Sequence, residues 1–218
     1  MLIIFDLDDT LIDTSGCVTP IALKHAFEKM TGAGLTLSCP QKGFDMLRRI
    51  DRHSVTARLS LDEFLEIHHE SNSFSSDSVS GSEPLSVQCL PGAIDLLAEL
   101  SSEHTLVLVT IGEEKTQRLK LSLAGIDPTL FSEIFICQKK GPIYKELAER
   151  YQRPTVVIGD KIGSDLRPAK AMGFKTIHIK WGRGLNCIDE SGVVDHTIWN
   201  LGDCRMLLTL IKEFSGQS

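Results

Sequence analysis

The sequence lacks several features that would place it in a specialised class of protein. No apolar run approaches the roughly 18 residues of a membrane-spanning helix. The N-terminus turns acidic at Asp6 without the basic segment of a signal peptide. No C-x-x-C pair occurs among the six widely spaced cysteines, which disfavours a zinc site or a disulfide framework. No internal repeat is visible. These absences predict a cytoplasmic protein with reduced thiols and no membrane partner.

Length and charge narrow the class further. At 218 residues the chain is long enough for one core with an insertion, but short for two full domains. Its hydrophobic content of 42% and charged content of 24% are ordinary for a globular protein. The net charge of −6 argues against nucleic acid or an anionic membrane as the main partner. The oligomeric state leaves no signature in the sequence.

Outside one internal segment, apolar strand patterns alternate with helical ones. Short apolar or β-branched runs occupy residues 2–5, 105–110, 134–137, 155–160 and 175–180. Amphipathic patterns that end in glycines lie between the later runs, for example before Gly125 and Gly173. This alternation predicts an α/β fold with a doubly wound parallel sheet. Trp199, near the end of the pattern, is expected to pack in the core.

The segment 15–90 differs because it contains helical patterns and no convincing strand. Ser60 and Glu63 have the spacing of a capping box at the start of one such helix. Residues 71–86 hold eight serines in sixteen positions, which predicts a polar loop. We therefore expect a core domain of residues 1–14 and 91–218. A mainly helical cap domain, residues 15–90, is inserted after the first strand.

Polar residues collect where the predicted strands end. Asp6 and Asp8 follow the first strand, Thr110 ends another, and Asp160 and Asp165 follow a third. The carboxyl ends of parallel strands meet at one edge of a sheet, which is where ligands bind in such folds. Four carboxylates at one point repel one another unless a cation compensates them. A hard divalent cation with oxygen ligands would do so, and Mg²⁺ is the usual choice beside phosphate.

These motifs resemble those of the haloacid dehalogenase superfamily in order and spacing. "DLDDT" at 6–10 matches D-x-D-x-T, and "LVT" at 108–110 matches the second motif. Lys139 or Lys140 matches the third motif, and "GDKIGSD" at 159–165 matches the fourth, G-D-x-x-x-x-D. The resemblance implies a Rossmann-like core with a helical cap of the first type. It also implies a phosphatase acting on a small phosphorylated metabolite.

The resemblance implies a role for each matching residue. Asp6 would attack phosphorus and form an aspartyl-phosphate, and Asp8 would act as general acid and then as general base. Thr110 would bind a phosphoryl oxygen, and a lysine would neutralise its charge. Lys139 and Lys140 are adjacent and cannot both face the site. Lys140 is favoured because it lies just before the following helix.

The metal ligands are implied in the same way. Mg²⁺ would be held by the Asp6 carboxylate, the Asp8 backbone carbonyl and Asp160, with Asp165 as a further ligand or as the partner of one. One departure from the family pattern stands out. Ile111 occupies the position after Thr110 where relatives commonly carry Asn, so we expect the Gly112 backbone N–H to replace the missing phosphate contact.

Other functions remain open on this scaffold. A phosphosugar mutase would share Asp6 and Asp8 but needs sugar-binding groups in the cap that the sequence does not reveal. In a haloacid dehalogenase in the strict sense, Asp8 and Asp160 would have no role in the reaction. A catalytically weak relative that binds a ligand or partner is favoured only by Ile111. No motif in the cap identifies the substrate.

Overall fold

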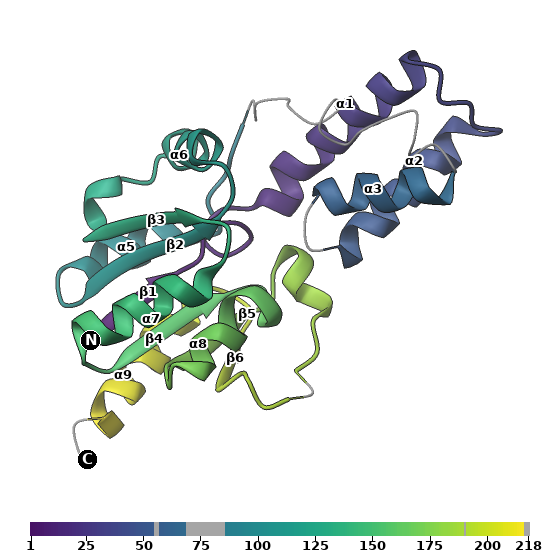
Figure 1. Ribbon diagram of the computed structural model, residues 1–218. Coiled ribbons are helices and arrows are strands. Elements are labelled where there is room, and N and C mark those ends of the chain that lie inside the picture. Colours follow the sequence, from purple (N-terminus) through teal and green to yellow (C-terminus); the bar gives the residue numbers. More distant parts are fainter. Residues whose placement is uncertain (55–56, 69–85, 190, 216–218) are drawn as a thin grey trace. The chain divides into compact units, whose positions relative to one another are not determined.

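The computed structural model describes residues 1–54, 57–68, 86–189 and 191–215 (Figure 1). The predicted serine-rich loop lies almost entirely outside these residues. The chain divides into two compact units. The core unit comprises residues 1–13 and 87–218, and the helical unit comprises residues 14–86. None of the six cysteines, all of which are described, forms a disulfide. Among the described helices, none has the length and apolar character needed to cross a membrane.

The core unit is built on one parallel sheet of six strands in the order β3-β2-β1-β4-β5-β6. The strands are β1 (Leu2–Phe5), β2 (Thr105–Ile111), β3 (Glu133–Cys137), β4 (Thr155–Gly159), β5 (Lys175–Ile179) and β6 (His196–Ile198). β1 lies between β2 and β4, with Phe5 level with Leu108 and Ile158. Its four residues are fully buried, as expected of a central parallel strand. The predicted doubly wound parallel sheet is confirmed.

Helices cover both faces of the sheet (Figure 1). α7 (Lys140–Tyr151) and α8 (Arg167–Ala171) lie on the near face, and α5 (Ala93–Ser101) and α9 (Asp203–Ser215) lie behind. An Arg205–Glu99 ion pair of 2.6 Å joins α9 to α5. The remaining helix is α6 (Glu114–Leu123), and short helical turns span Pro128–Leu130, Ile162–Leu166 and Gly182–Asn186. The near-face core packs β1, β2 and β4 against α7 and α8 through residues such as Val109, Leu147 and Val157.

The end of the core unit was predicted least well. β6 and α9 follow the predicted strands and add a sixth strand and a further covering helix. Trp199, expected in the core, is instead 63% exposed, so that prediction is wrong. It directly follows β6, and its neighbour Ile198 fills the buried position while Trp199 faces solvent. In a strand of three residues, alternation decides which neighbour is buried.

The two chain segments that connect the core unit to residues 14–86 lie side by side. The Asp13 N–H donates to the Gln88 carbonyl at 2.8 Å, and the Leu90 N–H donates to the Leu11 carbonyl at 2.8 Å. Ile12 and Cys89 form an antiparallel bridge between these bonds. The chain therefore leaves and re-enters the core unit through one paired ladder, next to the end of β1.

The helical unit contains a π-helical turn (Thr14–Val18), α1 (Thr19–Gly32), α2 (Pro40–His53) and α3 (Ala57–Ile67). Leu23, Phe27, Leu47 and Phe64 belong to its buried apolar core. The predicted capping box at Ser60 is wrong because Ser60 lies inside α3. Its hydroxyl donates to the buried Asp51 carboxylate of α2 at 2.9 Å. The local sequence pattern predicted the start of a helix at Ser60, whereas the serine side chain forms a contact between α3 and α2.

The Asp195 carboxylate joins the loop before β6 to β5 and α8. It accepts hydrogen bonds from the Thr176 N–H at 2.9 Å, the Thr176 hydroxyl at 3.0 Å and Lys170 at 2.6 Å. Burial alone would raise the pKa of Asp195, but these bonds outweigh it and lower the pKa below its ordinary value. A lowered pKa in the folded state means that Asp195 stabilises the fold above the unfolded pKa and loses this effect as pH falls.

We expect Asp195→Ala to lower the free energy of unfolding by about 1–3 kcal/mol at pH 7, because the Thr176 N–H loses its acceptor. Urea denaturation measures this difference, which should shrink as pH falls below about 4. Lys175→Met is the control, since Lys175 is exposed and lies 3.7 Å from Asp195. It should cost less than about 0.5 kcal/mol. A difference that stayed constant down to about pH 3 would contradict the assignment.

Candidate active site

The end of β1 places Asp6 at the carboxyl edge of the sheet. The Asp6 N–H donates to the Ile158 carbonyl at 3.0 Å, which continues the pairing with β4, and the residue is only 6% exposed. The chain then turns sharply, and the Leu7 carbonyl accepts from the N–H groups of Leu11 at 2.9 Å and Ile12 at 3.1 Å. This turn holds Asp8 directly after the strand. The strand end and the turn thus fix both predicted aspartates to the rigid sheet.

Lys140 is the cation at the centre of the site. Its ammonium group lies 2.5 Å from Asp6 Oδ1 and 3.0 Å from Asp165 Oδ1, and its side chain is 1% exposed. Lys140 begins α7, immediately after the loop that follows β3. Lys139 is exposed. Of the two adjacent lysines, the structure therefore brings Lys140 to the aspartates and leaves Lys139 outside.

Asp160 and Asp165 complete a cluster of three buried carboxylates with Asp6. Oxygen atoms of the three side chains lie within 4.8 Å of one another. Asp165 is held by the Lys161 N–H at 2.9 Å and the Ser164 hydroxyl at 2.9 Å. Asp160 follows β4 directly. Its Oδ2 is buried and has no hydrogen-bond partner among the described residues.

Burial dominates the electrostatics of this cluster. It raises the pKa of Asp6 to about 7, against the lowering effect of Lys140 and with a further contribution from Asp165 and Asp8. It also raises the pKa of Asp160 well above the ordinary value, and the nearby Asp165 and Asp6 charges add to the effect. Burial alone would lower the pKa of Lys140, but Asp165 and Asp6 outweigh it and raise the pKa. One lysine thus leaves the three carboxylates undercompensated.

A divalent cation fits this donor set. Three carboxylates with converging oxygens form the hard, anionic environment that Mg²⁺ prefers. The unpartnered Asp160 Oδ2 is a buried acceptor with no donor, as expected of a metal ligand. Asp6, Asp160 and Asp165, which the sequence predicted as ligands, are the residues that the structure brings together. No side-chain oxygen of Asp8 belongs to the group, and the contribution of its backbone carbonyl stays a prediction.

Two side chains at the site were not predicted from the sequence. Gln117 Nε2 donates to Asp8 Oδ2 at 2.8 Å and to Thr110 Oγ1 at 2.6 Å. Lys120 Nζ lies 2.7 Å from Asp8 Oδ1. Both residues lie on α6, on the same buried side as Leu121. Two polar residues in the core-facing stripe of an amphipathic helix were the signal that could have identified them.

The backbone N–H of Gly112, which was predicted to bind phosphate, already has a hydrogen-bond partner in the structure. The Gly112 N–H donates to the Cys137 carbonyl at 3.3 Å, so it already has a partner at the end of the β2–β3 ladder. The Ile111 carbonyl accepts from Gln117 Nε2 at 3.3 Å. Thr110 is fully buried between β1 and β3, one residue before the end of β2. A side-chain amide is therefore present beside Thr110, and it comes from α6.

Three glycines allow backbone and carboxylates to approach closely around the cluster. A Cβ at Gly159 would lie 2.8 Å from Asp165 Oδ2, and one at Gly184 would lie 2.3 Å from the Asp160 carbonyl oxygen. Gly182 has a left-handed φ of 48°, and its Cβ would lie 2.3 Å from the Asp9 carboxylate. Gly182 and Gly184 belong to "WGRG", which forms a short helical turn packed beside the site. No larger residue fits these three positions without displacing an aspartate or its backbone.

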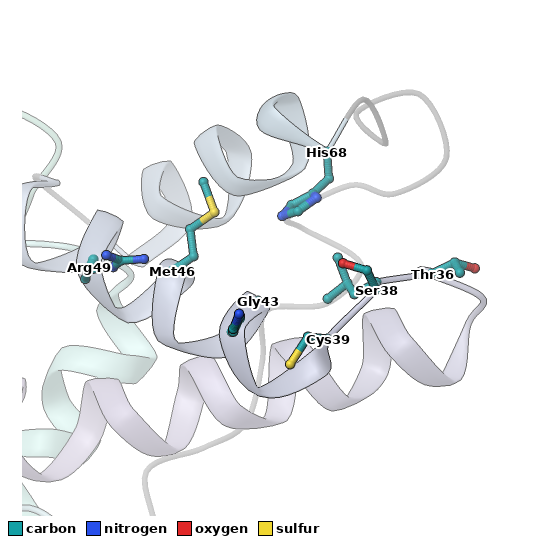
Figure 2. A pocket seen from close by; sticks show the side chains of 9 residues that line it. Thr36, Ser38, Cys39, Gly43, Met46, Arg49 and His68 are labelled. Carbon is teal, nitrogen blue, oxygen red and sulfur yellow. The ribbon is translucent and has the colours of Figure 1, made fainter.

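A separate pocket of about 430 Å³ belongs to the helical unit (Figure 2). Gly43, Met46 and Arg49 of α2 contribute to its lining, with Ser38 before α2 and His68 after α3. None of the residues predicted for the active site lines it. The lining of this pocket is mixed in character, with cationic, hydroxyl and apolar groups.

Comparisons with known proteins identify the family of this chain. A model of haloacid dehalogenase-like hydrolases matches residues 1–173. A glyceraldehyde 3-phosphate phosphatase of Methanocaldococcus jannaschii is 27% identical over 96% of this chain and 96% of its own length. One from Pyrococcus furiosus is 24% identical over 84% of this chain and 81% of its own.

Solved structures show the same fold. A haloacid dehalogenase-like hydrolase from Xanthomonas campestris has a TM-score of 0.69 and 17% identity, covering 100% of this chain and 98% of its own. The HAD-hydrolase YfnB of Bacillus subtilis, described as bound to magnesium, has a TM-score of 0.64 and 19% identity. It covers 95% of this chain and 98% of its own. At these identities the likeness establishes the fold alone.

The two lysines provide a test of the site's electrostatics. Lys140→Met should lower the free energy of unfolding by about 3–5 kcal/mol, because it removes the cation between two buried carboxylates. Lys139→Met should change it by less than about 0.5 kcal/mol, since the residue is exposed. Urea denaturation in the presence of a chelator measures both. Equal losses in the two variants would contradict the central position of Lys140.

Proposed function

The chain belongs to the haloacid dehalogenase-like hydrolases, and we propose on that premise that it is a Mg²⁺-dependent phosphatase of small phosphorylated metabolites. The observation that carries the proposal is the Asp6–Lys140–Asp165 arrangement at the sheet edge, with Asp160 beside it. It combines an anionic nucleophile, a buried cation and a converging set of oxygen ligands. Phosphate monoesters are among the slowest substrates to hydrolyse without catalysis, so all three are needed together.

In the proposed reaction Asp6 is the nucleophile. One of its carboxylate oxygens attacks phosphorus, the bond from phosphorus to the ester oxygen breaks, and Asp8 donates a proton to that leaving oxygen. Asp8 then takes a proton from a water molecule, which attacks phosphorus and releases phosphate and free Asp6. Thr10 supports the nucleophile, since its hydroxyl donates to Asp6 Oδ2 at 3.3 Å. Asp6 remains the nucleophile, and Asp8 remains the proton donor and acceptor, throughout the catalytic cycle.

The developing charge on the phosphoryl group needs donors around it. Lys140 supplies a buried ammonium group beside Asp6, and Thr110 supplies a hydroxyl at the end of the neighbouring strand. Asp6, Asp160 and the Asp8 backbone carbonyl would hold Mg²⁺, with Asp165 as a fourth group. The ion would neutralise negative charge on the phosphoryl oxygens and on the carboxylates that surround it.

The relatives guide the choice of substrate. Several are named glyceraldehyde 3-phosphate phosphatases, and they align with most of this chain. We therefore propose a small phosphorylated metabolite as the substrate and place glyceraldehyde 3-phosphate first among those to test. Residues 14–86, the proposed cap, supply no predicted group of the reaction centre, so substrate selection is assigned to that unit.

Asp6→Asn tests the nucleophile. We expect it to fold normally and to lose phosphatase activity by more than about 10³-fold, because an amide does not attack phosphorus. The measurement is phosphate release from glyceraldehyde 3-phosphate, a sugar phosphate, a nucleotide and an acyl phosphate, with Mg²⁺ and with chelator. Retained activity in Asp6→Asn would exclude the aspartyl-phosphate mechanism. Absence of release from every compound by the folded wild type would favour a mutase or a binding protein.

Asp160→Asn tests the metal site without measuring activity. Mg²⁺ should raise the midpoint of thermal unfolding of the wild type, since a ligand at 100 times its Kd stabilises by about 2.7 kcal/mol. Asp160→Asn should lose most of this response because it removes a ligand. Asp95→Asn, on exposed α5 surface, is the matched control and should respond like the wild type. Equal Mg²⁺ responses in all three proteins would place the ion elsewhere.

A further inference from the structure

The Asp8 carboxylate is held by two side chains that come from one helix. Gln117 and Lys120 lie about one turn apart on α6 and face the sheet. Gln117 Nε2 donates to Asp8 Oδ2 at 2.8 Å, and Lys120 Nζ binds Asp8 Oδ1 at 2.7 Å. Each carboxylate oxygen therefore has its own donor. A carboxylate bound through both oxygens has one favoured rotamer, whereas a carboxylate bound through one can still rotate.

Gln117 also controls the hydroxyl of Thr110. The side-chain amide nitrogen has two hydrogens and no acceptor capacity, and it lies 2.6 Å from Thr110 Oγ1. The threonine oxygen must therefore accept this bond, and its own hydrogen points elsewhere. That hydrogen is then available to donate to a phosphoryl oxygen. The reverse orientation of the amide is disfavoured because its oxygen would face the Asp8 carboxylate.

Burial makes these contacts stronger than other polar contacts on the same helix. Gln117 is 1% exposed, and the Lys120 side chain is 11% exposed. The Arg118–Glu114 pair, also 2.6 Å long, has side chains that are more than half exposed. Exposed pairs of this kind contribute little to structure, because water and salt screen them. α6 thus carries one solvated ion pair and one buried set of donors directed at Asp8.

We propose that Gln117 and Lys120 are positioning residues. They hold Asp8 in the rotamer from which it serves the leaving oxygen, and Gln117 orients the Thr110 hydroxyl toward the phosphoryl group. The inference rests on the proposed phosphatase function. It also gives a reason why Ile111 needs no polar side chain, since the amide beside Thr110 is delivered from α6.

The test compares substrates with different leaving groups. kcat/KM reports the step in which the ester bond breaks, where Asp8 protonates the leaving oxygen. An alkyl phosphate needs this proton because its leaving group is a strongly basic alkoxide, whereas 4-nitrophenyl phosphate releases the weakly basic 4-nitrophenolate without it. We expect Gln117→Leu and Lys120→Met each to lower kcat/KM by about 10²-fold for an alkyl phosphate. The loss for 4-nitrophenyl phosphate should be about tenfold smaller.

Conservative variants separate positioning from packing. Lys120→Arg keeps the charge and should retain most of the alkyl phosphate activity. Gln117→Glu keeps the shape but removes the N–H donors, so it should be as impaired as Gln117→Leu. Arg118→Gln is the matched control because it removes the exposed cation of the same helix, and it should behave as the wild type. Thermal unfolding of each variant checks that the fold is intact.

Each outcome bears on the inference. A loss that is larger for the poor leaving group, with rescue by Lys120→Arg, supports it. Equal losses for both substrates in folded variants, or no loss in Gln117→Leu and Lys120→Met, would overturn it while leaving the phosphatase function in place. If the wild type hydrolysed neither ester, the proposed function itself would fail, and the inference would fail with it.

Discussion

The compensation of buried negative charge at one edge of the sheet is the constraint on which the rest of the core unit depends. Asp6, Asp160 and Asp165 place their oxygens within 4.8 Å of one another, and all three residues are buried. Desolvated carboxylates are costly unless cations or hydrogen-bond donors surround them. Lys140 supplies part of that compensation, and the unpartnered Asp160 oxygen marks where more is required. The same charge imbalance that costs stability makes the site suited to bind a cation.

The strand order explains how residues so far apart in sequence reach this edge. β1 lies between β2 and β4, so Asp6, Thr110 and Asp160 follow or end three neighbouring strands. The helical unit follows β1 after residues 6–13, and the segments that lead out and back pair with each other at Ile12 and Cys89. The insertion therefore leaves the pairing of β1 with its two neighbours intact. A large addition at this point is compatible with a rigid reaction centre.

A second set of residues surrounds the candidate site and holds its side chains in place. Gly159, Gly182 and Gly184 leave room for aspartates and backbone to approach closely, while Gln117 and Lys120 of α6 hold the Asp8 carboxylate. These residues resemble ordinary turn or helix residues when read along the chain. Their importance comes from groups on other elements. A Cβ at any of the three glycines would collide with an aspartate side chain or its backbone, and Gln117 and Lys120 lie within 3 Å of the Asp8 carboxylate. Preorganisation of this kind is what gives a cluster of charged side chains a defined geometry.

The sequence by itself determined the parallel sheet, because fully buried strands must be continuous apolar runs, and it placed the chemistry at their ends. It also pointed to Asp6, Asp160 and Asp165, because they follow apolar runs and match motifs of the family that the chain resembles. The sequence favoured Lys140 over Lys139, but only the tertiary structure placed the Lys140 ammonium group beside Asp6. It also brought Gln117 and Lys120 to Asp8 and left Trp199 exposed to solvent. Ser60 was misread for the same reason. Local patterns record which side of an element is buried, but the partner of a buried polar group is set by packing between distant elements.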